Sequence, residues 1–310
     1  MSTLRINNIT DKAGKQGPVI AGVTTVSSTS HMVIPSGHTG QKYTDDGEGI
    51  VRNGLAFYVD AKYSLNSTSS PGTLYDMGPH GLHVTLFGSP SYDSDGGGSI
   101  IVNESSGTYG RATRKGHEFE TGYGGPFTME VWAKQTTQAD WAWALTTRAE
   151  ETGIGFHGSS GTPSTLYGRN GGGGRRIQFH ANATNNTWWH IALACNTTGQ
   201  GPIENQTGQD RSTTFGIRGD GTMNHGYYES PPGRHAYSSQ IAKGYRNGNK
   251  VFEKDIGGAD YSRNNEIQIG RWNSSEHMTG KVAIARIYNR CLSEGEILKN
   301  YNAQKARFGL

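Results

Sequence analysis

From residue 50 onward, apolar and polar residues alternate along the chain in short runs. The clearest runs are NGLAFYVDA at 53–61, FTMEVWAK at 127–134 and TWWHIALACN at 187–196. A period of two is that of a β-strand with one face on a core. The run KVAIARIYNR at 281–290 is apolar on both faces, as expected of a central strand. These patterns predict a core that contains Val131, Leu193, Ile284 and Ile287.

Turn-forming residues separate the strand-like runs. The chain has 46 glycines among 310 residues, which is too many for a helical protein. Many short strands joined by Gly- and Asn-rich turns predict an all-β fold, either a two-sheet sandwich or a jelly roll. Bulky aromatic side chains (15 Tyr, 9 Phe and 6 Trp) are available to fill its core.

One short helix is predicted near the C-terminus, at residues 293–306. Ser293 and Glu296 have the spacing of a capping box, in which each side chain bonds to a backbone N–H at the other residue. Ile297, Leu298 and Tyr301 follow as an apolar stripe, which we expect to pack on the sandwich.

Three segments lack the pattern of a core. Residues 1–48 contain short strand-like runs such as LRINNIT, separated by Gly, Pro and Ser. An arm of this kind buries little surface alone, so we expect it either to add strands to a neighbouring subunit or to be a loose leader. Residues 49–310 then form the sandwich, with long loops or inserted hairpins near 155–186 and 197–243.

Charge and composition exclude several classes of partner. The net charge of +3 gives no reason to expect a nucleic acid. No stretch approaches the roughly 20 apolar residues of a membrane span, and residues 1–20 have no apolar segment like that of a secretory signal.

Cys195 and Cys291 lack the spacing of zinc ligands, and we expect small core residues there, with a disulfide bridge as the alternative.

The order of several sequence blocks resembles a known family. These blocks are GLAFYVDAKYS, TLYDMGPHGLHVTL, GGGSIIVN, FTMEVWAK, TWWHIALACN, GYRNGNKVF, NEIQIGR and the C-terminal GKVAIARIYNRCLSEGEILKNYNAQKARFGL. In this order they resemble laminin G-like, concanavalin A-like domains, especially those in structural proteins of marine phages and cyanophages. The resemblance covers about residues 50–310 and implies a jelly-roll sandwich used for carbohydrate or protein recognition, with a short arm before it.

Catalysis and metal binding are not predicted. A retaining glycanase of this superfamily needs two carboxylates about 5–5.5 Å apart. Glu118 and Glu120 share one face if HEFE is extended, but a solvated strand end is the stronger interpretation. Some relatives bind Ca²⁺ at the sandwich rim, but no complete set of calcium ligands matches here. We therefore predict no catalytic residue, no metal and no cofactor, and Ca²⁺ binding stays an open alternative.

Aromatic rings beside polar side chains have the chemistry of a sugar-binding site, because a flat ring stacks on the apolar face of a pyranose. Trp141 and Trp143 share one face of a predicted strand, although core packing is the alternative for this pair. We expect a site among the irregular loops at 141–176 and 223–237. The predicted ligand-binding residues are Trp143, Arg148, Tyr167, Arg169, Arg176 and Tyr228.

The sequence thus predicts a non-enzymatic virion protein, displayed on a tail appendage or on the capsid exterior. Its arm is expected to contact other virion proteins, and the chain is expected to form a homo-oligomer. The favoured function is recognition of a host-surface glycan by a lectin-like domain of a tail fibre. The alternatives are a capsid or tail decoration protein with protein–protein contacts only and, less favoured, a glycan-degrading enzyme.

Overall fold

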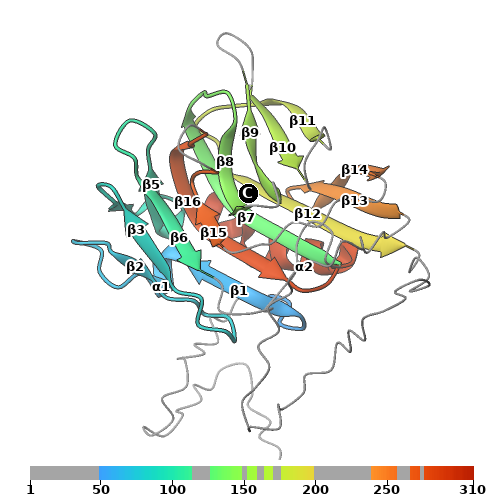
Figure 1. Ribbon diagram of the computed structural model, residues 1–310, viewed down its shortest axis with the longest axis horizontal. Coiled ribbons are helices and arrows are strands. Elements are labelled where there is room, and N and C mark those ends of the chain that lie inside the picture. Colours follow the sequence, from blue (N-terminus) through green and yellow to red (C-terminus); the bar gives the residue numbers. More distant parts are fainter. Residues whose placement is uncertain are drawn as a thin grey trace, which may run out of the picture. The chain divides into compact units, whose positions relative to one another are not determined.

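Two antiparallel sheets of eight strands each form the fold (Figure 1). The computed structural model describes residues 49–113, 126–148, 152–158, 164–169, 176–198, 239–256, 266–272 and 276–310. The arm at residues 1–48, the glutamates at 118 and 120, and most of the segment 197–243 lie outside the described residues. The predicted two-sheet sandwich with a C-terminal helix is confirmed.

The first sheet has the strand order β14-β13-β12-β7-β16-β5-β4, and β1 pairs with β16 beside β5. Its strands are β1 (Leu55–Asp60), β4 (Ser91–Asp93), β5 (Ser99–Val102), β7 (Phe127–Thr137), β12 (Trp189–Thr198), β13 (Ser239–Arg246), β14 (Asn249–Asp255) and β16 (Thr279–Tyr288). The run predicted as a central strand is β16, which pairs with β7 on one side and with β1 and β5 on the other.

The second sheet has the strand order β11-β10-β9-β8-β15-β6-β3-β2. Its strands are β2 (Thr73–Leu74), β3 (Val84–Phe87), β6 (Tyr109–Thr113), β8 (Ala142–Arg148), β9 (Thr152–His157), β10 (Ser164–Arg169), β11 (Arg176–Ala183) and β15 (Glu266–Ile269). The helical elements are α1 (Ala61–Ser64), α2 (Glu294–Gln304) and the 3-10 turns η1 (Asp95–Gly97) and η2 (Lys305–Phe308).

The main hydrophobic core lies between the two sheets. Val131, Leu193 and Ile287 contribute to it from the first sheet, and Leu145 and Ile267 contribute from the second. All four predicted core residues are confirmed as buried, with exposed fractions of 0–1%. Ile284, however, belongs to a second cluster, on the other face of the first sheet.

This second cluster exists because α2 and η2 cover the outer face of the first sheet (Figure 1). Trp132 on β7 is fully buried there, and its ring stacks on Phe308 of η2 at 4.0 Å between centroids. Arg307 anchors the same segment, since its Nη1 lies 2.6 Å from Oδ2 of the buried Asp60. β7 and β16 are therefore buried on both faces over most of their length, and the polar Thr128 and Glu130 on β7 do not meet solvent.

The helix begins where the sequence predicts, but a different face is buried. The capping box between Ser293 and Glu296 is present, and α2 runs from Glu294 to Gln304 before it tightens into η2. Ile297 is buried as expected, whereas Leu298 is 41% exposed. The polar residues Asn300 and Gln304 take the buried positions, because polar groups of the sheet face them.

The segment near 155–186 was expected to consist of loops or inserted hairpins, and it supplies strands to the second sheet. β9, β10 and β11 pair in succession at one end of that sheet. The apolar pattern of this segment is weak because several of its strand positions are glycines. At these positions neighbouring side chains fill the space that a larger residue would need. A Cβ at Gly168 would lie 2.5 Å from the ring of Phe179, and one at Gly153 would lie 2.7 Å from Thr146.

Both cysteines are free thiols; a core position was predicted for both, and Cys291 is only half-buried. Cys195 is fully buried in the core between the sheets. Burial raises the pKa of both thiols, so both stay protonated and weakly reactive at neutral pH.

Candidate functional site

A group of three tryptophans lies on the outer face of the second sheet. Ala142 and Ala144 on β8 belong to the main core, so Trp143 between them lies on the opposite face. Its ring centroid is 4.9 Å from that of Trp272 and 6.3 Å from that of Trp141. The indole N–H of Trp143 donates a 2.8 Å hydrogen bond to Glu276, which fixes the orientation of the ring. We call Trp141, Trp143 and Trp272 the tryptophan cluster.

Trp141 is the member of this cluster that meets solvent. It is partly exposed, whereas Trp143 and Trp272 are 1% and 8% exposed. Its backbone φ is +62°, a left-handed conformation that is rare for a bulky residue and that Gly or Asn would adopt at lower cost. Such strain is typical of positions where the placement of a side chain matters to function. The turn before β8 therefore holds an aromatic ring at the surface at the expense of backbone energy.

Polar groups surround the exposed ring of Trp141. The ring of His157, at the end of β9, lies 4.1 Å from it between centroids. His157 Nε2 lies 3.0 Å from a carboxylate oxygen of Asp140, whose side chain is 64% exposed. A partly exposed indole, packed against an imidazole that is itself paired with a carboxylate, offers an apolar surface beside hydrogen-bonding groups.

A second pair of rings lies on the same face, on the neighbouring strands β3 and β6. Phe87 and Tyr109 are paired in register, and their rings are nearly parallel, with centroids 5.0 Å apart. A guanidinium group lies over each ring: that of Arg111 is 4.8 Å from the Phe87 centroid, and that of Arg271 is 3.2 Å from the Tyr109 centroid. All four side chains are partly exposed. We call Phe87 and Tyr109 the Phe–Tyr pair.

Residues 268–272 connect the two aromatic groups. Arg271, which lies over Tyr109, directly precedes Trp272 of the tryptophan cluster. The hydroxyl of Thr146 on β8 donates a 2.8 Å hydrogen bond to the carbonyl of Arg271, and Arg271 Nε lies 3.4 Å from the side-chain oxygen of Gln268. The tryptophan cluster, the Phe–Tyr pair and the partly exposed Arg271 form one band across the sheet, which we call the aromatic band, whereas Thr146 and Gln268 are fully buried.

The sequence-predicted site residues fall partly in this region. Trp143 belongs to the band, but its 1% exposure agrees with the core alternative and not with a ring open to a ligand. Arg148 ends β8, Tyr167 and Arg169 lie on β10, and Arg176 begins β11. These four are strand positions, not the irregular loop positions that we expected.

The strand register relates these positions to Trp143. Gly155 on β9 pairs with Trp143 on one side and with Tyr167 on the other, and Arg169 pairs with Gly153 and Arg176. The backbone positions of Tyr167, Arg169 and Arg176 therefore share the sheet face that carries Trp143. Their side chains, the side chain of Arg148 and all of Tyr228 lie outside the described residues.

Sequence reasoning missed most of the band. The residues not anticipated are Phe87, Tyr109, Asp140, His157, Arg271, Trp272 and Glu276. They come from β3, β6, the turn before β8, β9 and the segment after β15, and the strand pairing brings these segments together. The available signal was the pair Trp141 and Trp143, whose shared face was recognised.

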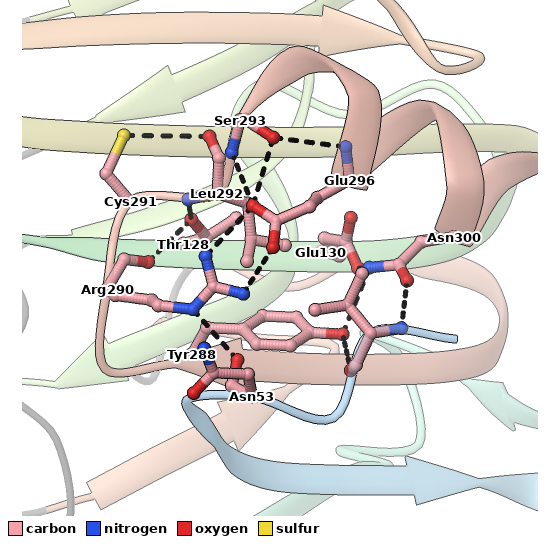
Figure 2. A network of polar contacts seen from close by, with 11 residues as sticks. Asn53, Thr128, Glu130, Tyr288, Arg290, Cys291, Leu292, Ser293, Glu296 and Asn300 are labelled. Carbon is pink, nitrogen blue, oxygen red and sulfur yellow. Dashed lines mark hydrogen bonds and ion pairs between the residues drawn. The ribbon is translucent and has the colours of Figure 1, made fainter. Parts of the chain in front are cut away.

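A second cluster of ionisable groups lies between the first sheet and α2, and Figure 2 shows one of its members, Glu130, beside Asn300 of the helix. Glu130 on β7 lies 3.2 Å from Arg286 on β16 and 3.7 Å from His190 on β12, and all three side chains are fully buried. Burial opposes ionisation of Glu130, but the charge of Arg286, the nearby His190 and the hydrogen bond from Asn300 lower its pKa below the ordinary value. The carboxylate is therefore charged at neutral pH inside the protein.

This buried cluster serves to attach the helix. Asn300 on α2 donates hydrogen bonds to Glu130 at 2.9 Å and to the hydroxyl of Tyr288 at 3.0 Å, and it accepts one from the N–H of Val51 at 2.8 Å. Figure 2 shows these bonds beside the pair of Arg290 and Glu296 at the helix start, whose nitrogen and oxygen atoms are 2.6 Å apart. Because α2 covers the cluster, we assign it to the fold and not to ligand binding.

Two other kinds of site find no support in the described part of the chain. Among the described residues, no three His, Cys, Asp or Glu side chains gather in an arrangement that could hold a metal ion. Within the same residues, no helix has the length and apolar character that a membrane span requires.

Comparison with known proteins defines the class of fold. No protein-family model matches the chain, and no curated protein sequence matches it. The receptor-binding domain of botulinum neurotoxin C/D mosaic serotype has a similar structure, with a TM-score of 0.53, 12% identity and coverage of 82% of this chain and 52% of the other. The binding domain of botulinum neurotoxin DC, solved in complex with rat synaptotagmin II, gives the same values.

The binding domain of Paraclostridial Mosquitocidal Protein 1 is also similar, with a TM-score of 0.50, 13% identity and coverage of 81% of this chain and 52% of the other. This chain thus spans about half the length of these toxin chains. At such identities the likeness defines the fold alone. The chain is a two-sheet β-sandwich protein.

Proposed function

We propose that this protein is a non-enzymatic binding protein of a bacteriophage particle and that the aromatic band of its second sheet binds a glycan on the host surface. The observation that carries the glycan assignment is Trp141, which is held at a strained backbone angle, partly exposed and stacked on an immobilised tryptophan. Flat apolar faces edged by hydroxyls are the chemistry that such a ring recognises, and Asp140 and His157 supply hydrogen-bonding groups beside it.

The place in a virion rests on the sequence resemblance to structural proteins of marine phages. In that setting the sandwich is displayed on a tail appendage or the capsid exterior, and residues 1–48 attach it to other virion proteins. The structural neighbours are compatible with display for recognition, since they are a receptor-binding domain and a binding domain of toxins. Binding without turnover is part of the proposal, because Glu276, a carboxylate in the band, already holds the Trp143 indole.

A glycan array probed with the full chain tests this function directly. The wild-type protein should bind a defined group of glycans, and Trp141→Ala should lower the affinity for them by at least about tenfold, or about 1.4 kcal/mol. Tyr63→Ala is the matched control, because Tyr63 is an exposed aromatic residue (43%) that lies on α1, outside the band. Incubation of the bound glycan with the protein should release no new reducing ends.

The decoration alternative gives a different result. A protein with protein–protein contacts only would bind no glycan on the array. Equal binding by Trp141→Ala and wild type would show that the aromatic band is not the glycan site. In a phage that carries the variant Tyr167→Ala with Arg169→Ala, glycan recognition predicts weaker adsorption to cells with normal particle assembly. Failed assembly of those particles would favour the decoration role.

A further inference from the structure

We propose, resting on the function proposed above, that the outer face of β2, β3 and β6 binds an acidic sugar unit of the host glycan through its carboxylate or sulfate oxygens. These strands form one end of the second sheet (Figure 1). The residues of this face that carry the inference, which we call the donor face, are Thr73, Tyr75, His83, Thr85 and Arg111.

Three of these residues form a row across the strands. Thr73 on β2 pairs with Thr85 on β3, and Thr85 pairs in turn with Arg111 on β6. Leu74 and Val84, which adjoin them in sequence, belong to the main core, so the row lies on the opposite, outer face. Thr85 is exposed, Thr73 is partly exposed, and the side chain of Arg111 is 37% exposed. The whole row is therefore open to a ligand.

Tyr75 and His83 form the next row of the donor face. The side chain of Tyr75 is 51% exposed, and its ring meets that of His83 edge to face, with centroids 5.2 Å apart. The backbone N–H of Asp76 donates a 3.0 Å hydrogen bond to His83 Nδ1. In the neutral imidazole the proton therefore lies on Nε2, which makes the ring an N–H donor in a fixed orientation.

The fold leaves the donors of this face unused. Within the described residues the Arg111 guanidinium makes no hydrogen bond, and its only ion pair, with Glu266, has a long N–O separation of 3.8 Å. The hydroxyl of Thr85 and Nε2 of His83 likewise have no hydrogen-bond partner in the described part of the chain. Neither strand residues nor side chains of the donor face thus compete with a ligand for these groups.

The charge of the face selects the kind of ligand. None of the residues of β2, β3 and β6 is acidic, whereas Arg111 carries a positive charge that is partly exposed. A guanidinium group donates hydrogen bonds and accepts none, and it binds a carboxylate through two parallel bonds. A face that offers donors and positive charge is complementary to a ligand that supplies negatively charged oxygen atoms.

The exposed ring of Tyr75 favours a sugar over a free anion. Thr85 is the direct cross-strand neighbour of Arg111 and a diagonal neighbour of Tyr75. Direct neighbours lie about 4.5–5.5 Å apart and diagonal ones about 7–8 Å. A sugar unit over Thr85 can therefore meet the Tyr75 ring on one side and present its acidic group to Arg111 on the other.

Matched acidic and neutral forms of one glycan test the proposal. The probes are oligosaccharides of each glycan that the wild-type chain binds on the array, in the native form and after carboxyl reduction or desulfation, measured by calorimetry with the full-length protein. We expect the acidic form to bind at least about tenfold tighter, because neutralisation removes a charge-assisted hydrogen bond. Arg111→Gln should abolish this preference and leave the affinity for the neutral form within about twofold.

Two further variants make the result independent of folding. Thr85→Glu places a carboxylate directly opposite Arg111, which should pair with the guanidinium and remove the preference without loss of a stabilising contact. Lys299→Gln is the matched control, because it removes an exposed positive charge from α2, which covers the first sheet. This control should leave the preference for the acidic form unchanged.

The outcomes separate the two levels of the proposal. If every glycan bound on the array is neutral, or if Arg111→Gln keeps the preference of the wild type, the acidic-sugar inference is overturned while the glycan function stands. Absence of binding to every probe would overturn the function itself. Arg111-dependent binding to phosphatidylglycerol vesicles, with no preference between acidic and neutral glycans, would assign the donor face to a lipid headgroup and also overturn the inference.

Discussion

Replacement of Asn300 by Ala tests how the C-terminal helix is held to the sandwich. The change removes three buried hydrogen bonds: one to the ionised Glu130, one to the Tyr288 hydroxyl and one from the Val51 N–H. A hydrogen bond to a charged group contributes about 1.5–3 kcal/mol, and a neutral one about 0.5–1.5 kcal/mol. The sum is about 2.5–6 kcal/mol, and we expect the free energy of unfolding to fall by about 4 kcal/mol.

Urea denaturation followed by tryptophan fluorescence measures this change. With a slope of about 3 kcal/mol per M, the midpoint for Asn300→Ala should fall by about 1.3 M. Asn302→Ala is the matched control, because Asn302 is exposed on the same helix and should change stability by less than about 0.5 kcal/mol. Equal midpoints for the two variants would refute the assignment of the buried cluster to helix attachment.

Three further predictions concern stability and assembly. Ile287→Ala should cost about 2–5 kcal/mol, since Ile287 is fully buried between the sheets, and an unchanged urea midpoint would contradict this. The hydrogen bond from Arg290 lowers the pKa of Glu296 to about 2 from an ordinary 4.5. The ionised Glu296 therefore stabilises the fold above about pH 4.5, and this stabilisation is lost as the pH falls toward about 2. In Glu296→Gln the acid-unfolding curve should be flatter over this pH range, and an unchanged curve would contradict the prediction. A chain that starts at Gly49 should fold normally yet fail to join particles, and normal incorporation in a particle-binding assay would exclude the arm as the anchor.

The strand pattern predicted the sandwich well because period-two alternation is a local property of the sequence. The runs that became β1, β7, β12 and β16 were recognised from it, as was the helix from its capping box. The pattern cannot show what covers the second face of a sheet. Glu130 alternates with apolar residues as a solvent-exposed side chain would, yet α2 buries it. The buried carboxylate accepts a hydrogen bond from Asn300, which lies 170 residues later in the chain.

The proposed binding face was harder to predict for a related reason. Trp141 and Trp143 are close in sequence, and their shared face was recognised. Phe87 and Arg271 join them only through the strand order, which places β3 and β15 in the same sheet as β8. The segment around β10 was expected to be irregular because glycines such as Gly168 occupy strand positions where the Phe179 ring leaves no room for a side chain.

An NMR titration of the indole N–H signals tests the central claim most directly. The chain has six tryptophans, of which Trp141, Trp143 and Trp272 lie in the aromatic band, while Trp132 and Trp188 lie under the C-terminal segment. On addition of the glycan that binds best on the array, the signals of the three band tryptophans should shift and saturate together, and those of the others should stay in place. Shifts confined to Trp132, Trp188 or Trp189, or no saturable shift at any indole, would contradict glycan binding at this face.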